Sequence, residues 1–156
     1  MRDLKWDIHE DYQRELQVLY DLFVYANDAT PKRVQVFCPK RDNAGRAFWP
    51  ERVVTVPAFV FNDEKGRVWS PRHSSWIDVP KKPGYVEYYL AHELAHIYVF
   101  DYHGLRGDKI DGDHGERFMS AFKSLCPIQW QHYEYEYKPD SARKSDVSVE
   151  GAGSHV

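Results

Sequence analysis

The residues best suited to chemistry are two histidines and a glutamate in the apolar run YYLAHELAHIYVF, residues 88–100. His92 and His96 are four residues apart, and Glu93 directly follows the first histidine. On a helix, residues four apart lie on one face about 6 Å apart along the axis, so both imidazoles can reach one metal ion. Glu93 is rotated by about 100° from His92, which places its carboxylate beside such an ion. This HExxH spacing predicts a hydrolytic zinc site, with His92 and His96 as ligands and Glu93 as the base that activates a metal-bound water.

The alternative is that the HExxH pattern arises by chance and that its histidines are structural. The apolar surroundings argue against this, because two imidazoles and a carboxylate are costly to bury without a partner. A metal ion supplies that partner. A catalytic zinc usually has three protein ligands and a water, so a third ligand is expected elsewhere in the chain. The segment DHGERF, residues 113–118, offers His114 and Glu116.

HELAH, followed by a loop and HGERF, resembles the SprT-like (Spartan-related) zinc metallopeptidases of the zincin class. The close resemblance covers residues 92–118, and a less specific one extends over residues 8–138. It implies a zinc-dependent endopeptidase with His92, His96 and His114 as metal ligands and Glu93 as the catalytic residue. It also implies polypeptide substrates, among them DNA-associated proteins, and DNA as a partner.

The position of His114 on a predicted helix also favours it as the third ligand. If Asp113 caps that helix, Glu116 lies about 200° round from His114, on a solvated stripe where it can close a capping box with Asp113. His114 shares its face with apolar residues at inward positions, namely Phe118, Ala121, Phe122 and Leu125. We therefore expect His114 to face the core.

Other HExxH classes fit the sequence less well. A metzincin would have a glycine where Val99 stands, and His103 is one residue too late to be its third histidine. His103 is also about 10 Å beyond His96 along the helix axis, too far to share its ion. A peptide deformylase would supply a cysteine ligand, but the VFCPK segment around Cys38 does not match its motif. A gluzincin would use a glutamate on a later helix, which leaves Glu116 as an open alternative.

The elements that must position these residues are predicted to form an α+β, zincin-like domain with a small mixed sheet. The apolar spacing predicts a first helix over residues 8–26, capped by the Asp7 and Glu10 pair. RVQVFC and RVVTVPAFVF (residues 33–38 and 52–61) read as strands, with Pro57 marking an edge, a bulge or a break between two short strands. A turn is predicted over residues 62–67 and a strand over 75–79. A helix is predicted over 85–102, ended by Gly104. Another helix is predicted over 114–125, capped by Asp113 and Glu116 and stopped by Pro127.

Residues 1–138 are predicted to form one metallopeptidase domain, and the polar residues 139–156 a disordered tail. The N-terminal residues carry charges where a signal peptide would be apolar, and no run is long enough to cross a membrane, so a cytoplasmic protein is expected. Cys38 and Cys126 have no CxxC partner and are expected to be free thiols. The sequence suggests no role for the long stretch from Gly45 to Trp76.

The formal net charge of −3 argues against a general affinity for nucleic acid. Residues 31–52 are nevertheless locally basic. The basic residues there are Lys32, Arg33, Lys40, Arg41, Arg46 and Arg52. The rival hypothesis is therefore a zincin-like binding module that retains metal for stability and recognises nucleic acid or a protein through this region without proteolysis. Glu93 argues against that hypothesis, because a structural zinc needs no general base.

For the endopeptidase, an extended polypeptide is expected to pair with an exposed strand such as SWIDV, residues 75–79. Stabilisation of the oxyanion formed during hydrolysis would need a hydrogen-bond donor. The tyrosine candidates, which the sequence does not rank, are Tyr98, Tyr102, Tyr133 and Tyr135.

Overall fold

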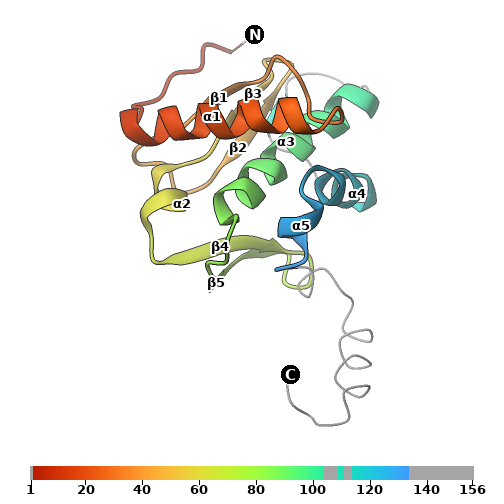
Figure 1. The fold of residues 1–156 in the computed structure, drawn as a ribbon. Coiled ribbons are helices and arrows are strands. Elements are labelled where there is room, and N and C mark those ends of the chain that lie inside the picture. Colours follow the sequence, from red (N-terminus) through yellow and green to blue (C-terminus); the bar gives the residue numbers. More distant parts are fainter. Residues whose placement is uncertain (1, 104–108, 111–113, 134–156) are drawn as a thin grey trace.

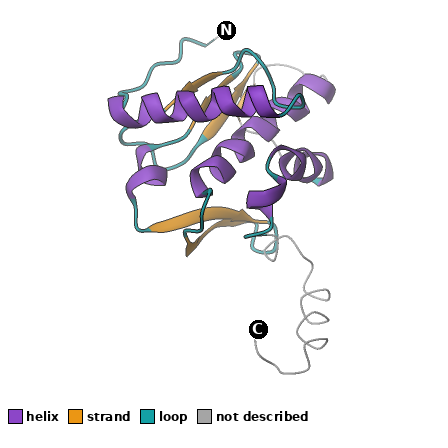
Figure 2. Ribbon diagram, viewed as in Figure 1, coloured by secondary structure: helices purple, strands orange, loops and turns teal. Residues whose placement is uncertain are grey.

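The computed structural model describes residues 2–103, 109–110 and 114–133 of the chain (Figure 1). The helices are α1 (Glu10–Ala26), α2 (Ala58–Asn62), α3 (Tyr85–His103), α4 (Glu116–Leu125) and α5 (Pro127–Trp130). The strands are β1 (Gln35–Phe37), β2 (Arg46–Trp49), β3 (Val53–Thr55), β4 (Lys65–Ser70), β5 (Ser75–Pro80) and β6 (Lys109–Ile110). This combination of helices and small sheets confirms the predicted α+β class (Figure 2). The predictions for Gly104, Asp113, Tyr135 and the tail 139–156 fall outside the described residues.

The larger sheet has four strands in the order β1-β3-β2-β6, with β1 and β3 parallel and β2 antiparallel to both of its neighbours. Val36, Val54 and Ala47 are neighbours in register and belong to the same buried core as α1 and α3. Trp6, from the segment before α1, packs against Phe37 with ring centroids 5.3 Å apart. Because successive strand residues point to opposite faces, Trp6 covers the face away from the helices.

The first helix ends at Ala26 as predicted, but the predicted cap is wrong. His9 is the N-cap, and its Nδ1 accepts the backbone N–H of Tyr12 at 3.3 Å. Asp7 lies outside the helix and pairs with Lys40 at 3.7 Å. The His9 imidazole therefore caps the N-terminus of the helix, and the Asp7 carboxylate instead pairs with a lysine in the segment after β1.

The predicted strand over residues 52–61 is only half right, because the chain turns into helix α2 after Pro57. Val56 still donates to the Phe37 carbonyl at 2.9 Å, as a strand residue would. Pro57 has no N–H to continue the ladder and becomes the N-cap of α2, with φ −65° and ψ 159°. The predicted turn over 62–67 is correspondingly too long, since β4 begins at Lys65.

The stretch 45–76, which had no predicted role, contributes β2, β3, α2 and β4. Strand β4 pairs antiparallel with β5, the strand predicted over 75–79, and Trp69 lies opposite Trp76. The hairpin forms a separate two-stranded sheet below α3 in Figure 1. Gly66 of β4 lies against the Tyr85 ring, where a Cβ atom would be 2.9 Å from Tyr85 Cε1.

Helix α3 runs through the core and is buried on nearly all sides, which explains its continuously apolar sequence. Helix α4 begins at Glu116, with Gly115 as its N-cap, so the predicted start at His114 is wrong. The buried face of α4 is nevertheless the predicted one, made of Phe118, Ala121, Phe122 and Leu125. Pro127 stops α4 and opens α5, where a first-turn proline costs no hydrogen bond.

Cys38 and Cys126 are both buried free cysteines, as predicted. Burial raises the pKa of the Cys38 thiol to about 12, so this thiol is not a ready nucleophile. Among the described residues, none of the helices has the length and apolar character needed to cross a membrane.

Candidate metal centre

The two histidines of the HExxH pattern lie in the middle of α3 and face the same side. His92 and His96 are each only 2% exposed, and their ring centroids are 5.2 Å apart. Burial lowers the pKa of both imidazoles well below the usual range, and the neighbouring histidines lower it further. Both rings are therefore neutral at pH 7, which is the protonation state that binds a metal ion.

His114 completes this pair from a distant part of the chain. It lies just before the N-cap of α4, and its Nε2 is 3.3 Å from Nε2 of His92. One nitrogen from each of the three histidines lies within 4.8 Å of the others, so the group could hold a metal ion. In the part of the chain that the structure describes, no other set of three or more ligating side chains is grouped in this way.

Glu93 lies in the same pocket but is not part of the histidine group. Its side chain is fully buried, with 0% exposure. Across the pocket, Gly45 is so close that a Cβ atom on it would be 3.0 Å from Glu93 Oε2. The carboxylate is therefore enclosed beside the three histidines, in the position that helix geometry predicted for it.

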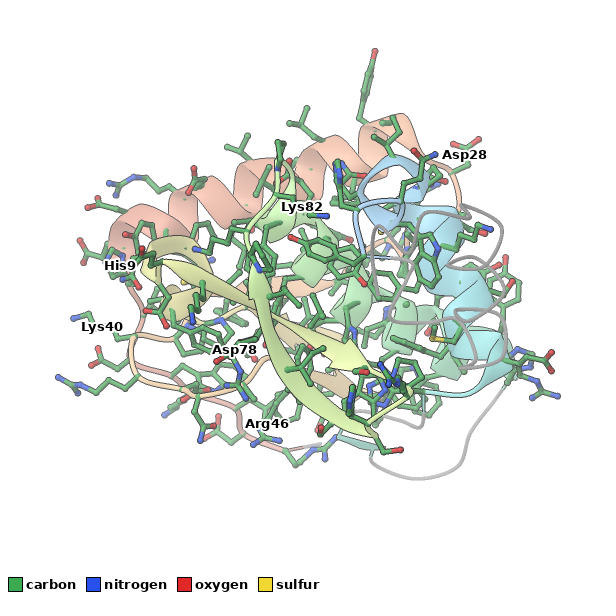
Figure 3. All side chains as sticks on the ribbon, turned by 90° about the horizontal axis from the view of Figure 1, so that it is seen from below. His9, Asp28, Lys40, Arg46, Asp78 and Lys82 are labelled. Carbon is green, nitrogen blue, oxygen red and sulfur yellow. The ribbon has the colours of Figure 1, made fainter. Side chains whose placement is uncertain are left out.

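The pocket at this centre has a volume of about 100 Å³. Besides the three histidines and Glu93, its lining residues are Ala44, Gly45, Arg46 and Trp76. The hairpin contributes a second tryptophan, Trp69, whose ring stacks on His114 with centroids 4.1 Å apart and planes at 16°. Figure 3 views the molecule from the hairpin side, with Arg46 of β2 and Asp78 of β5 labelled.

Neither these additional lining residues nor Trp69, which contacts His114 without lining the pocket, was predicted from the sequence to lie at this centre. One signal was present: WSPRHSSW places two tryptophans around a Ser/Pro-rich segment, as expected for facing strands of a hairpin. Strand β4 was missed because its sequence, KGRVWS, is mostly polar, and its buried positions are filled by Gly66, Val68 and Ser70.

The alternative third ligands lie elsewhere. Glu116 and His103 are both exposed and line a different pocket, of about 440 Å³, together with Tyr98. Among the described tyrosines considered as oxyanion donors, Tyr98 and Tyr102 stack on each other with centroids 4.4 Å apart. The Tyr133 hydroxyl is engaged with the backbone of Lys82 and Pro80. None of these three tyrosines lines the histidine pocket.

The basic side chains of residues 31–52 are divided among three places. Lys40 and Arg41 pair with Asp7. Arg46 lines the histidine pocket. Lys32, Arg33 and Arg52 line a separate pocket of about 490 Å³, where Arg52 forms an ion pair with Asp101.

No family model matches the chain, and neither a curated protein nor a solved structure matches it.

Proposed function

We propose that this protein is a zinc-dependent endopeptidase with a zincin-like catalytic centre, related to the SprT-like metallopeptidases. The observation that carries the proposal is the meeting of His114 with His92 and His96 beside a buried glutamate. Three histidines grouped within 4.8 Å of one another, with a carboxylate in the same pocket, form the set of groups needed for metal-assisted hydrolysis. A purely structural zinc usually has four protein ligands and no neighbouring base.

The three histidines offer one nitrogen each, all within 4.8 Å of one another, and imidazole nitrogens are common ligands of zinc. The Nε2 atoms of His92 and His114 are 3.3 Å apart. When bound in such a site, zinc acts as a Lewis acid and lowers the pKa of a coordinated water to about 7. His92, His96 and His114 would hold it.

Glu93 is assigned the role of general base. It follows His92 directly on α3, so its carboxylate is turned away from the ligand face and toward the space beside it. Its enclosure by Gly45 fixes where the carboxylate lies. From that position Glu93 would take the proton of the attacking water and later deliver it to the leaving amine.

The proposed substrate is an extended polypeptide that pairs with β5. Trp76 of this strand lines the histidine pocket. Among the described strands β5 pairs only with β4, so its other edge is available for an added strand. By the resemblance to SprT-like proteins, DNA-associated proteins are the proposed substrate class. A cytoplasmic location is a separate part of the proposal.

The proposal is tested with a Glu93→Gln variant and a matched control, Glu87→Gln, on the same helix. Zinc content and casein cleavage would be measured for both, with and without a chelator and with and without single-stranded DNA. Glu93→Gln should keep its zinc and lose roughly 10²- to 10⁴-fold in cleavage rate, because the base is not a ligand. Glu87→Gln should behave as the wild type does.

Two results would overturn the assignment: an empty metal site in the wild type, or wild-type cleavage by Glu93→Gln. A wild type that binds zinc but cleaves no polypeptide under any of these conditions would favour the metal-containing binding module instead.

A further inference from the structure

The third histidine differs from the other two in how its ring is held. His92 and His96 belong to the buried helix α3, whose backbone hydrogen bonds fix where their side chains start. His114 precedes the N-cap of α4 and is therefore outside any helix. The position of its imidazole must depend more strongly on contacts made by the ring itself.

Besides His92 and His96, the His114 ring contacts two aromatic side chains, Phe118 and Trp69. Phe118, one turn into α4, meets the His114 ring edge-on, with centroids 4.9 Å apart. Trp69 of β4 covers the ring in a nearly parallel stack, with centroids 4.1 Å apart. A stack of this kind restricts the tilt of an imidazole more than an edge contact does, because it bears on the whole ring face.

Trp69 belongs to a hairpin that is joined to the rest of the domain largely through side chains. Among the described strands, β4 and β5 pair only with each other. Trp76 anchors the hairpin by stacking on Tyr89, with ring centroids 5.3 Å apart. The Tyr85 hydroxyl is a second anchor: it accepts the backbone N–H of Arg67 at 2.6 Å and donates to the Arg67 carbonyl at 2.8 Å. A two-stranded hairpin is marginally stable alone, so each of these anchors matters for its docking.

We propose that Trp69 is a positioning residue for the metal centre: it holds His114 in its ligating orientation, so metal binding and docking of the β4–β5 hairpin are linked. The inference rests on the proposed metal site. A bound cation makes an imidazole ring electron-poor, and the electron-rich face of an indole then attracts it more strongly. Linkage between two equilibria is reciprocal. If the docked hairpin strengthens metal binding through Trp69, a bound metal must also stabilise the docked state of the hairpin.

The test compares Trp69→Phe, which keeps an aromatic face, with Trp69→Leu, which keeps apolar bulk but no ring. Asp78→Asn, an exposed change on β5, serves as the hairpin control. Zinc affinity is measured by competition with a chromophoric chelator. Trp69→Leu should bind zinc roughly 10- to 100-fold more weakly, the usual loss when a group that orients a ligand is removed. Trp69→Phe should recover most of that loss, and Asp78→Asn should match the wild type.

Hydrogen exchange of the full chain provides the second measurement. Zinc should slow amide exchange in residues 65–80 of the wild type and of Trp69→Phe, and should slow it much less in Trp69→Leu. Exchange in residues 10–26 of α1 reports whether each variant is folded. Equal zinc affinities for Trp69→Leu and the wild type, or hairpin exchange that does not respond to zinc, would overturn the inference and leave the proposed peptidase intact. A wild type that binds no zinc would overturn both.

Discussion

The backbone N–H of Gly45 donates a hydrogen bond to the Tyr89 hydroxyl at 2.9 Å. This bond brings the segment before β2 against α3, one helical turn before Glu93. Only glycine permits the approach, because a Cβ atom at residue 45 would lie 2.6 Å from Tyr89 Cε1 and 2.8 Å from the Thr55 carbonyl oxygen. The shape of the pocket wall opposite Glu93 therefore depends on the absence of a side chain at residue 45.

Gly45→Ala should disturb both stability and catalysis. The added methyl group overfills a packed site, so we expect a loss of about 1–3 kcal/mol in unfolding free energy, measured by urea titration. It would also push on Glu93, so cleavage should fall more than zinc content does. The control is Gly84→Ala, where φ is +81° and the new Cβ would meet Gln129. That variant should lose stability but keep its cleavage rate per folded molecule, and equal cleavage by both variants would contradict the role of Gly45.

His114→Ala should lose both zinc binding and cleavage, whereas Glu116→Ala and His103→Ala should lose neither. The reason is geometric: His114 joins His92 within hydrogen-bonding distance, and the other two candidates line a different pocket. Zinc affinity and casein cleavage of the three variants would be measured side by side. If Glu116→Ala released the metal while His114→Ala kept it, the centre would be of gluzincin type.

The Arg2–Glu51 ion pair should stabilise the fold at neutral pH and contribute less as the pH becomes acidic. Two hydrogen bonds of 2.6 and 2.7 Å from the Arg2 guanidinium lower the pKa of the Glu51 carboxyl from 4.5 to about 2. A carboxyl with a lowered pKa stabilises the fold above its unfolded pKa and loses that contribution as pH falls toward the folded pKa. The deficit of Glu51→Gln against the wild type in urea unfolding should be full at pH 7 and smaller at pH 3. Glu15→Gln, an exposed change on α1, should show no such trend, and a constant deficit for Glu51→Gln would exclude the ion pair as its source.

Arg52 has a positive φ of 59°, and its guanidinium contacts Asp101 and the Lys32 carbonyl. Arg52→Gly and Arg52→Ala both remove these contacts, but only glycine adopts the backbone conformation without strain. We therefore expect Arg52→Gly to be more stable than Arg52→Ala by up to about 1 kcal/mol in thermal or urea unfolding. The same pair at Lys65, an exposed strand residue, should show the opposite order. The same order at both positions would argue against backbone strain at Arg52.

Much of the secondary structure could be predicted because its signals are local. The end of α1 follows from apolar spacing, α3 from a long and mostly apolar run, and β1 and β5 from short apolar or β-branched runs. Errors arose where a local signal was ambiguous. A histidine replaced the expected aspartate as the cap of α1, and Pro57 started a helix where a broken strand was expected.

The geometry of His92, Glu93 and His96 was determined by the sequence itself, because three residues within two helical turns have relative positions that any helix imposes. His114 was named from the sequence, but its predicted place on a helix was wrong. Tertiary packing determines where it lies, because the packing of α4 on α3 brings His114 to the histidine pair. The roles of Gly45, Trp69 and Trp76 were decided by tertiary structure alone. Their contacts with the centre join segments far apart in the chain, and spacing along a sequence does not determine which distant surfaces pack together.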